Sequence, residues 1–371
     1  MDNHYQVVVY GASGYTGKLT AWKLAERGIP FIAAGRNAAR LEAEMAALPE
    51  LKGHDYKCVA VDNNKASLVE LFRGRKVVLN VVGPFMQLGL PVVEACLEAG
   101  CHYFDTTGET DWMFLLKREY GARFAEKSLV LCPANSYMWT EGLLATEIAL
   151  ETPGIDSLNV VYLADSGVSV ASTKSFLRMC TKPQFHIQNR ELVQWEYAKA
   201  FQVLLPGEHE FLNALPWGGG GEPVWYAGDP RVRNCKTLVS FRNQEAFNGV
   251  LGLLQKFENE CRHLSPEDQE QTTNQWGGDI TTAEPAREDP EVNRCVLSCH
   301  ARGKTNSVSV ILRGSSPYVQ TGVLGAEAAR RILRGQFDAV GFASPAKVFG
   351  ARNLLGALAE EGYLNWEVKS I

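Results

Sequence analysis

The sequence predicts an α/β protein, with a doubly wound parallel sheet in residues 1–150 and an inserted α+β second domain. Two observations predict this organisation. In residues 1–150, short apolar runs such as QVVVYG and KVVLNVVGP alternate with helical stretches, as in parallel sheets that are covered by helices on both faces. After residue 150 the apolar stretches are longer and alternate with polar residues, which is typical of mixed or antiparallel sheets.

Six strands are expected in the first domain, each a short apolar run. In chain order they lie in QVVVYG, PFIAAGR, YKCVAVD, KVVLNVVGP, CHYFDTTGE and SLVLCPA. Helices are expected between them, the first over residues 15–27. Because a helical crossover joins parallel strands, these elements predict one parallel sheet.

The second domain is expected over residues 151–315. Its RCVLSCHARGKTNSVSVILRG segment predicts an antiparallel hairpin that turns near RGKTN, and helices are expected near residues 173–181 and 244–263. Residues 265–291 are acidic with almost no aliphatic side chains, which predicts a solvated, mobile loop. The pattern then returns to helices over residues 316–371, and we expect these to pack back on the first domain.

Two features of the second domain, a glycine run and a set of aromatic residues, are candidates for lining a ligand pocket. Four consecutive glycines follow Trp217, which indicates either a flexible loop or a loop that lies against a flat ligand. Its aromatic side chains either line a pocket for an apolar or aromatic substrate or belong to the core; they are Trp195, Phe211, Trp217, Trp225 and Tyr226.

Composition and charge limit the function classes. The 371 residues are 46% apolar and 21% charged, which is ordinary for a globular protein. The formal net charge of −5 and the absence of a basic tract argue against a nucleic-acid partner. The segment MDNHYQVVVY lacks the features of a signal peptide, and no window approaches the roughly 18 apolar residues of a transmembrane helix.

The nine cysteines are odd in number and scattered through apolar runs, which predicts reduced, buried thiols and a cytoplasmic protein. Cys295, Cys299 and His300 lie close together, but there is no C-x-x-C pair and no second pair of ligands. We therefore expect no metal site, and a strand whose alternate residues face the core.

The first strand ends in YGASGYTG, with Gly11, Gly14 and Gly17 spaced by three residues. A strand followed by a glycine turn and a helix places backbone N–H groups at a helix N-terminus, which binds phosphate. In this variant of the dinucleotide-binding turn, Gly11 would permit the tight turn, Gly14 the approach of a phosphate and Gly17 close helix packing, while Ser13 and Thr16 add hydroxyl donors. The alternative is a tight turn with no ligand.

The residue after the second strand selects the nucleotide. An acid there accepts the ribose 2′-hydroxyl of NAD, whereas a basic residue meets the 2′-phosphate of NADP. Here AAGRNAARL has Gly35 and Arg36 in place of an acid, with Arg40 one turn further on. Arg36 can bind a phosphate through two hydrogen bonds, so NADP(H) is favoured over NAD(H). The alternative is that Arg36 is a surface charge.

Further cofactor contacts are expected at the ends of the third and fourth strands. Asp62 ends the third strand, where it would meet the adenine edge. Asn80, Gly83, Pro84 and Phe85 form the loop after the fourth strand, which would line the pyrophosphate and the nicotinamide ribose. Open α/β sheets bind ligands at these carboxyl ends.

Polar residues after the fifth and sixth strands are candidate proton donors. Asp105 and Glu109 lie in YFDTTGE, and Tyr137 lies in CPANSYMWTEG. Suitably tuned carboxyl and phenol groups can transfer protons, so each of the three is a candidate catalytic residue. The alternative for each is a helix cap or a buried hydrogen bond.

Several segments together resemble saccharopine dehydrogenase-like oxidoreductases, and within them the trans-acting enoyl reductases. The resemblance rests on VVVYGASGYTG, AAGRN, LNVVGPFMQLGLPVVEACLEAGCHYFDTTGE and SPAKVFGARNLLGALAEEG. It implies a Rossmann-type sheet with an inserted α+β substrate domain, NADP(H) as cofactor, and reduction of a C=C or C=N bond.

The resemblance also implies the residues that hold the cofactor. These are Gly11, Ser13, Gly14, Tyr15, Thr16, Gly17, Arg36 and the loop from Asn80 to Phe85. The middle domain departs most from the family, and CPANSYMWTEG lacks the D-P-G-like stretch of saccharopine enzymes, so an amino-acid opine substrate is not expected.

The sequence therefore predicts an NADPH-dependent oxidoreductase that reduces a conjugated C=C bond (enoyl- or enone-like) or a C=N bond of a small apolar or aromatic substrate. Two alternatives remain open. One is a non-catalytic NADP(H)-binding protein, either a redox sensor or a lipid-associated binding protein; the other uses the bound dinucleotide for a non-redox reaction. A homodimer formed through the second domain is a candidate assembly.

Overall fold

The structure, a computed structural model, describes residues 4–370, which form two compact units. The first unit contains the residues up to Thr107, Asp111–Thr140 and Tyr318–Leu358. The second contains Gly108–Thr110, Glu141–Pro317 and the residues from Ala359 onward. The boundary near residue 140 falls inside a helix, about ten residues before the change of pattern in the sequence.

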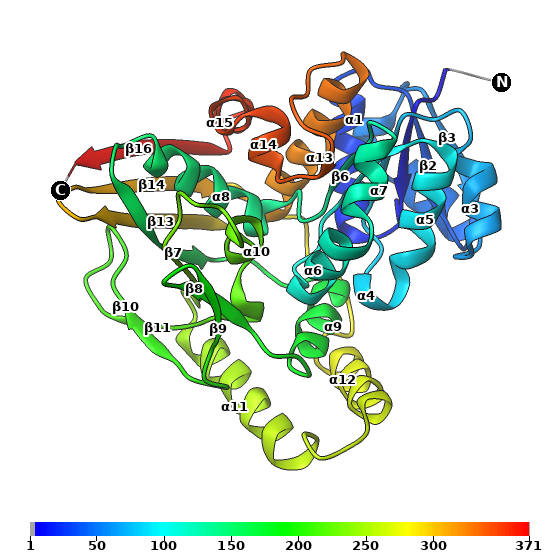
Figure 1. The fold of residues 1–371 in the computed structure, drawn as a ribbon. Coiled ribbons are helices and arrows are strands. Elements are labelled where there is room, and N and C mark those ends of the chain that lie inside the picture. The colour runs from blue at the N-terminus through cyan, green and yellow to red at the C-terminus, as the bar shows by residue number, and fades with distance from the viewer. Residues whose placement is uncertain (1–3, 371) are drawn as a thin grey trace. The chain divides into compact units, whose positions relative to one another are not determined.

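The first unit is built on a seven-stranded parallel sheet, of which Figure 1 labels β2, β3 and β6. The strand order is β15-β6-β5-β4-β1-β2-β3. The strands are β1 (Val7–Tyr10), β2 (Phe31–Gly35), β3 (Tyr56–Ala60), β4 (Val77–Asn80), β5 (His102–Asp105), β6 (Val130–Cys132) and β15 (Gly341–Phe342). All four residues of β1 are buried, as expected for a continuous apolar run. Because the winding reverses between β1 and β4, the carboxyl ends of these two strands form the crevice where such sheets bind ligands.

Helices connect these strands and confirm the predicted alternation. They are α1 (Tyr15–Glu26), α2 (Ala38–Ala46), α3 (Lys65–Phe72), α4 (Phe85–Leu88), α5 (Leu90–Ala99), α6 (Thr110–Glu119), α7 (Gly121–Glu126), α13 (Pro317–Leu333), α14 (Pro345–Phe349) and α15 (Ala351–Glu360). Helix α13 lies directly against α1, because a Cβ atom at Gly322 would lie 2.9 Å from the carbonyl oxygen of Leu19. A glycine at this crossing lets the two backbones approach closely.

The second unit is built on a mixed sheet whose main path runs β10-β11-β12-β7-β13-β14-β16. Its strands are β7 (Ile155–Ala164), β8 (Phe185–Gln188), β9 (Glu191–Gln194), β10 (Phe201–Val203), β11 (Leu212–Leu215), β12 (Asn234–Phe241), β13 (Arg294–Gly303), β14 (Ser307–Ser315) and β16 (Leu364–Ser370). The predicted hairpin is confirmed as β13 and β14, and Cys295 and Cys299 lie buried in β13 as ordinary strand residues. Only the β7–β12 pair on this path is parallel.

Helices of the second unit include the two that the sequence predicts, α9 (Val170–Met179) and α11 (Gln244–Glu260). The others are α8 (Tyr137–Leu150), which crosses the boundary between the units, α10 (Glu222–Tyr226) and α12 (Pro266–Ile280). Among residues 4–370, no helix combines the length and the apolar character that crossing a bilayer requires.

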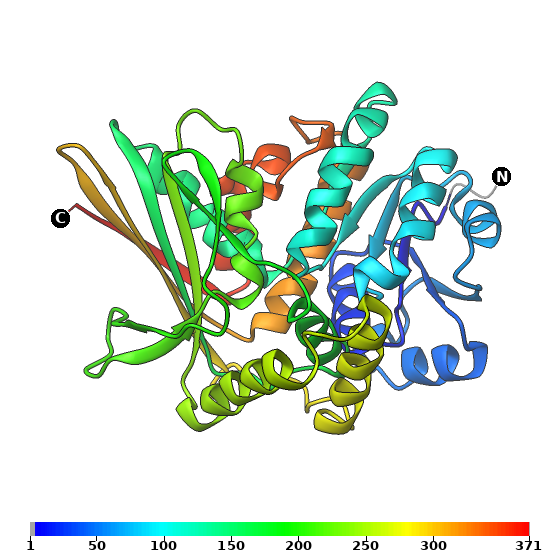
Figure 2. The same cartoon turned by 60° about the horizontal axis from the view of Figure 1, so that its bottom comes forward.

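The predicted loop over residues 265–291 is wrong in its first half, because residues 266–280 form α12, the yellow helix in Figure 2. Ser265 caps this helix by accepting a hydrogen bond from the N–H of Asp268 (3.1 Å), and Pro266 occupies the first helical position. Because most residues of α12 are polar, the sequence lacks the apolar repeat that predicts a helix. Gly277 instead lets α12 approach α9, since a Cβ atom there would lie 2.8 Å from Cγ of Lys174.

The expectation of helices over residues 316–371 overlooked two strands, β15 and β16. Strand β16 pairs with β14 in the second sheet, so the end of the chain does not belong to the first unit. Leu364, Trp366 and Val368 alternate with polar residues in the manner of a strand. The helical pattern of the preceding residues led to this two-residue alternation being overlooked.

A buried carboxyl group joins four elements of the second unit. Glu222 at the start of α10 is fully buried and accepts hydrogen bonds from the hydroxyls of Tyr162 on β7 (2.8 Å) and Thr237 on β12 (2.9 Å). The N–H of Gly142 on α8 donates to the same Tyr162 oxygen (2.7 Å). Burial raises the pKa of Glu222 to about 7, although its hydrogen bonds oppose the shift.

This pKa predicts a pH-dependent stability. Because the folded-state pKa lies above the ordinary value of 4.5, the stabilisation is complete below that value and is lost as the pH rises through about 7. We expect the urea-unfolding free energy of the wild type to fall between pH 5 and 8 by about 2 kcal/mol more than that of Glu222→Gln. Parallel pH profiles for the two proteins would show that Glu222 does not titrate in this range.

Candidate functional site

The turn between β1 and α1 is held in one conformation by its backbone. The N–H groups of Gly11 and Ala12 both donate to the carbonyl of Ala34 on β2, at 2.8 and 3.2 Å. Gly11 has a φ of +96°, and a Cβ atom there would lie 2.7 Å from Cγ2 of Val82. No other residue fits this position without displacing the chain after β4.

The second and third glycines bring α1 close to the turn. Gly14 is the N-cap of α1, offers no side-chain acceptor to the first helical turn, and donates its N–H to the carbonyl of Gly11 (3.0 Å). A Cβ atom at Gly17 would lie 2.3 Å from that same carbonyl oxygen. The result is a helix N-terminus closely backed by glycine backbone, here called the glycine cradle, and helix N-termini of this kind can bind a phosphate.

The other predicted residues of this turn differ in their surroundings. Ser13 and Thr16 are partly exposed, and Ser13 Oγ lies 3.8 Å from the position of a Cβ at Gly35, beside the end of β2. Tyr15 is buried, and its ring packs edge-on against Tyr318 with ring centres 5.0 Å apart. Its side chain therefore joins α1 to α13, and its backbone remains at the cradle.

Arg36 and Asp62 lie at the ends of the adjacent strands β2 and β3. The N–H of Val61 donates to the carbonyl of Gly35 (2.9 Å), which continues the pairing up to these two residues. Both side chains are exposed, and Arg36 forms no ion pair with another described residue. Burial raises the pKa of Tyr10, at the end of β1, to about 12, while Arg36 opposes and Asp62 adds to this shift.

The loop after β4 packs on the glycine turn. Asn80 is fully buried, and its side-chain oxygen accepts a hydrogen bond from the N–H of Val82 (3.1 Å). The side chain of Val82 is the one that fills the space beside Gly11. Gly83 and Pro84 then lead into α4, where the ring of Phe85 is 6% exposed. The two loops that would contact a dinucleotide thus contact each other.

Asp105 at the end of β5 anchors this edge of the sheet. One carboxylate oxygen accepts hydrogen bonds from the hydroxyl of Tyr103 (2.8 Å) and Nε1 of Trp112 (2.9 Å). The other accepts from the N–H groups of Thr107 (3.0 Å) and Ala134 (2.9 Å). Tyr103 also accepts a hydrogen bond from Asn80 (3.0 Å), so the network extends to the β4 loop. Burial raises the pKa of Asp105 to about 6, against the effect of the four donors.

The other two candidate proton donors lie in different units. Tyr137 begins α8 in the first unit, is 5% exposed, and donates its N–H to the hydroxyl of Thr321 on α13 (3.0 Å). Glu109 belongs to the second unit, where it is fully buried and forms an ion pair with Nε of Arg178 (2.9 Å) and a hydrogen bond with Ser175. The structure therefore provides a structural role for Glu109, as for Asp105, and their catalytic roles stay predictions.

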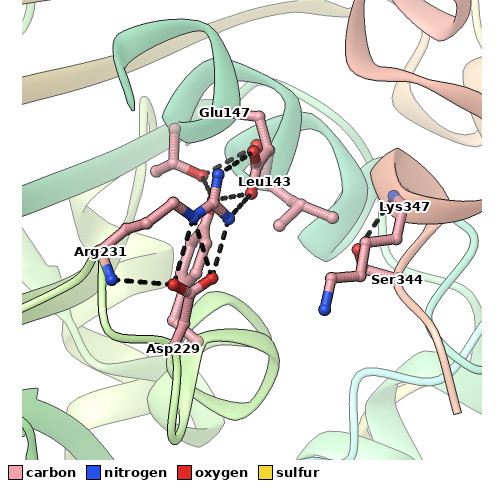
Figure 3. Close-up of polar contacts among 8 residues, drawn as sticks. Leu143, Glu147, Asp229, Arg231, Ser344 and Lys347 are labelled. Carbon is pink, nitrogen blue, oxygen red and sulfur yellow. Dashed lines mark hydrogen bonds and ion pairs between the residues drawn. The ribbon is translucent and has the colours of Figure 1, made fainter. Parts of the chain in front are cut away.

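A separate charged cluster in the second unit is internally paired (Figure 3). The guanidinium of Arg231 contacts both carboxylate oxygens of Glu147, at 2.9 and 3.0 Å, and those of Asp229. In the first unit, Ser344 caps α14 through the N–H of Lys347 (3.2 Å). Both arrangements satisfy their charges or donors locally, so neither is a candidate binding site.

Two family models match the chain. The saccharopine dehydrogenase NADP binding domain matches residues 7–128, and a family of unknown function, DUF5938, matches residues 140–369, which is more than half of the 371 residues. The chain belongs to the DUF5938 family, and its first 128 residues include a saccharopine dehydrogenase NADP binding domain.

Curated relatives resemble a limited part of this chain. A saccharopine dehydrogenase-like oxidoreductase of Mus musculus is 31% identical over 147 residues, 36% of this chain and 34% of the relative. A trans-acting enoyl reductase of Mycobacterium leprae (strain TN) is 41% identical over 108 residues, 28% of this chain and 26% of the relative. The matched part thus spans about a third of these relatives or less.

The fold extends beyond this matched part. The apo histidine-tagged saccharopine dehydrogenase (L-Glu forming) from Saccharomyces cerevisiae superimposes with a TM-score of 0.61 over 98% of this chain and 99% of that chain. The two sequences are 11% identical, so the comparison shows the saccharopine dehydrogenase fold in both units. The predicted fold class is confirmed.

The residues of the first unit fit the NADP-binding domain of the family. The cradle at Gly11 and Gly17 has no room for a Cβ atom, and a ligand phosphate would meet backbone N–H groups there. Arg36 is exposed and forms no ion pair within residues 4–370, so it is available to meet the 2′-phosphate that distinguishes NADP from NAD.

Several residues that build this site were not found from the sequence. Tyr103 lies two residues before the predicted Asp105 on the same strand, so the side of the strand that the two residues share was a usable signal. The contact of Trp112 on α6 with Asp105 depends on how α6 packs after β5, which the sequence does not show. The contact between Tyr137 and Thr321 spans 184 residues and leaves no local pattern.

Gly11 provides a test of the cradle. We expect Gly11→Ala to weaken NADPH binding at least tenfold, because its Cβ atom would displace the β4 loop through Val82. Gly100→Ala is the matched control, since Gly100 also has a positive φ, +80°, but nothing lies within 4 Å of its Cβ position. Fluorescence titration with NADPH should show an unchanged affinity for this control. Its free energy of unfolding should fall by about 1 kcal/mol, measured separately by urea unfolding. Equal affinities for both variants would contradict the cradle.

Proposed function

We infer that this chain is an NADPH-dependent reductase, acting on a conjugated C=C bond of the enoyl or enone type or on a C=N bond in a small apolar or aromatic substrate. The observation that carries the proposal is Arg36, an exposed cation that follows β2 beside the glycine cradle and forms no ion pair with any residue the structure describes. The match to an NADP binding domain over residues 7–128 supports it.

The residues of the first unit would divide the binding of the cofactor among them. The first turn of α1, with Gly14, Thr16 and Gly17, would hold the pyrophosphate through backbone and hydroxyl donors. Arg36 and Ser13 would meet the 2′-phosphate, since both lie at the end of β2. Asp62 would meet the adenine, and Asn80 with the loop through Gly83, Pro84 and Phe85 would position the nicotinamide ribose.

The reaction type is proposed from relatives and from the cofactor. The relative of Mycobacterium leprae (strain TN) is named a trans-acting enoyl reductase, and it resembles this chain at 41% identity over 108 residues. When bound, NADPH supplies a hydride to an electron-poor carbon. The chain must then align the acceptor, exclude water and provide a proton.

Tyr137 is the proposed proton donor. Both carboxylate oxygens of Asp105 already accept hydrogen bonds that hold the loops, and the carboxylate of Glu109 is engaged by Arg178 and Ser175. Tyr137 lies in the same unit as the cradle, directly after the β6 loop, and its backbone is fixed by Thr321. Asp105 and Glu109 would then act as positioning residues.

The cofactor preference is tested at Arg36. We expect Arg36→Ala to weaken NADPH binding about 10- to 100-fold, the cost of losing charge-assisted hydrogen bonds, and to leave NADH binding unchanged. The control is Arg73→Ala, which removes an exposed charge paired with Glu70 on α3 in the same unit. Fluorescence titrations with NADPH and NADH measure both constants. Tighter binding of NADH by the wild type would overturn the assignment.

The proton donor is tested in steady-state kinetics. A screen of NADPH oxidation with enones, enoyl thioesters and imines first identifies a substrate; NADPH binding without turnover on all three would favour the redox sensor. We then expect Tyr137→Phe to lower kcat about 100-fold with an unchanged KM for NADPH. Tyr120→Phe is the matched control, because that buried hydroxyl bonds to Glu94 (3.1 Å). An unchanged kcat in Tyr137→Phe would exclude this role.

A further inference from the structure

Asn135 lies at the edge of the parallel sheet where the nicotinamide half of the cofactor would bind. Its N–H donates to the carbonyl of Asp105 (2.8 Å), so the loop after β6 returns to the carboxyl end of β5. Strand β5 adjoins β4, with Asp105 opposite Asn80. In the proposed function, the adenine half of the cofactor extends from the glycine cradle toward Arg36, and the nicotinamide half extends toward the loop after β4. Asn135 is therefore on the nicotinamide side, within the first unit.

The backbone directly before Asn135 has a left-handed conformation that residues other than glycine rarely adopt. Ala134 is fully buried and has a φ of +57°. Its N–H donates to a carboxylate oxygen of Asp105 (2.9 Å), which helps to hold this turn. Unfavourable backbone conformations persist only where the surrounding contacts impose them, and they cluster at functional sites. The turn at Ala134 directs the chain from the end of β6 to the end of β5.

The amide group of Asn135 is anchored through its nitrogen. The side chain is 1% exposed, and Nδ2 donates to the carbonyl of Leu324 on α13 (3.1 Å). This hydrogen bond fixes the orientation of the amide, because a carbonyl group can pair only with the nitrogen. The amide oxygen, Oδ1, accepts no hydrogen bond from any residue in the range 4–370. Buried polar atoms in folded proteins nearly always have a partner, so this acceptor indicates a donor from a ligand.

The neighbouring polar side chains at this edge are already satisfied. Asn80 uses both ends of its amide, since Nδ2 donates to the hydroxyl of Tyr103 (3.0 Å) and Oδ1 accepts from the N–H of Val82 (3.1 Å). Both carboxylate oxygens of Asp105 accept hydrogen bonds as well. Of the three residues Asn80, Asp105 and Asn135, only Asn135 keeps an acceptor that no residue in the described part of the chain uses.

We propose that Oδ1 of Asn135 accepts a hydrogen bond from the carboxamide NH2 group of the bound nicotinamide. An amide oxygen pairs only with a donor, and the carboxamide is the donor of the nicotinamide half that lies farthest from the phosphates. The hydrogen bond sets the rotation of the nicotinamide ring, and therefore the face of C4 that meets the substrate. The proposal rests on the proposed function, because it assigns a further contact to the same cofactor.

The test compares oxidised NADP with its 3-acetylpyridine analogue, in which a methyl group replaces the carboxamide NH2 group. Calorimetric titrations of the full chain should show about tenfold tighter binding of NADP, because the analogue leaves the buried acceptor without a donor. In Asn135→Ala the two affinities should differ by less than about twofold, since the acceptor itself is gone. Equal affinities in the wild type, or a tenfold preference that survives in Asn135→Ala, overturn the proposal.

A matched variant and a shorter ligand serve as controls. Nδ2 of Asn353 also donates to a backbone carbonyl of the first unit, that of Phe349 (2.8 Å), but its side chain is exposed, so Asn353→Ala should keep the tenfold preference. The ligand 2′,5′-ADP lacks the nicotinamide and should bind the wild type and Asn135→Ala equally, which verifies that the variant is folded. Asn135→Ser replaces Asn135→Ala if the alanine variant does not fold.

The same titrations separate the two ways of failing. Wild-type protein that binds neither 2′,5′-ADP nor NADP overturns the proposed function, and the assignment of Asn135 with it. Wild-type protein that binds 2′,5′-ADP, NADP and the analogue, with equal affinity for the two dinucleotides, overturns only the assignment of Asn135.

Discussion

The buried carboxylate of Asp105 is the interaction on which the edge of the parallel sheet depends. Its four hydrogen bonds fix the ends of β5 and β6 and the start of α6, and through Tyr103 they reach Asn80 after β4. Each of these loops is short and carries backbone groups that need partners away from water. A single acceptor with two oxygens satisfies several of them, and the positions of Tyr137 and of the β4 loop follow from it.

Sequence reasoning succeeded where the cause was local. Gly17 packs against the carbonyl oxygen of Gly11 within the same turn, and Arg36 directly follows β2. The contact of Gly11 with Val82 after β4 is distant in the chain and was not predicted. Apolar runs predicted the parallel strands because burial on both faces leaves no room for polar residues. The sequence did not predict features that depend on elements far apart in the chain. Helix α12 is polar, and Gly277 lets it pack against α9. Gly322 on α13 is explained only by its close contact with α1.

The two units depend on glycines and on buried polar groups in different ways. The first presents backbone N–H groups at the start of α1 and Arg36 after β2, which suit a phosphate. The second buries Glu222 in a hydrogen-bonded network that joins α10, β7 and β12. In each unit, glycines with positive φ permit close backbone contacts, as at Gly11 and Gly219.

The way the chain is shared between the units bears on how it is synthesised. Each unit is assembled from three segments, so the chain passes between them five times, and β16, which completes the second sheet, follows every other described strand in the chain. Until Leu364–Ser370 leaves the ribosome, one edge of β14 has no backbone partner. An open strand edge is a site of aggregation. Neither unit can be excised as one continuous fragment, and the nascent second unit needs protection until β16 has been made.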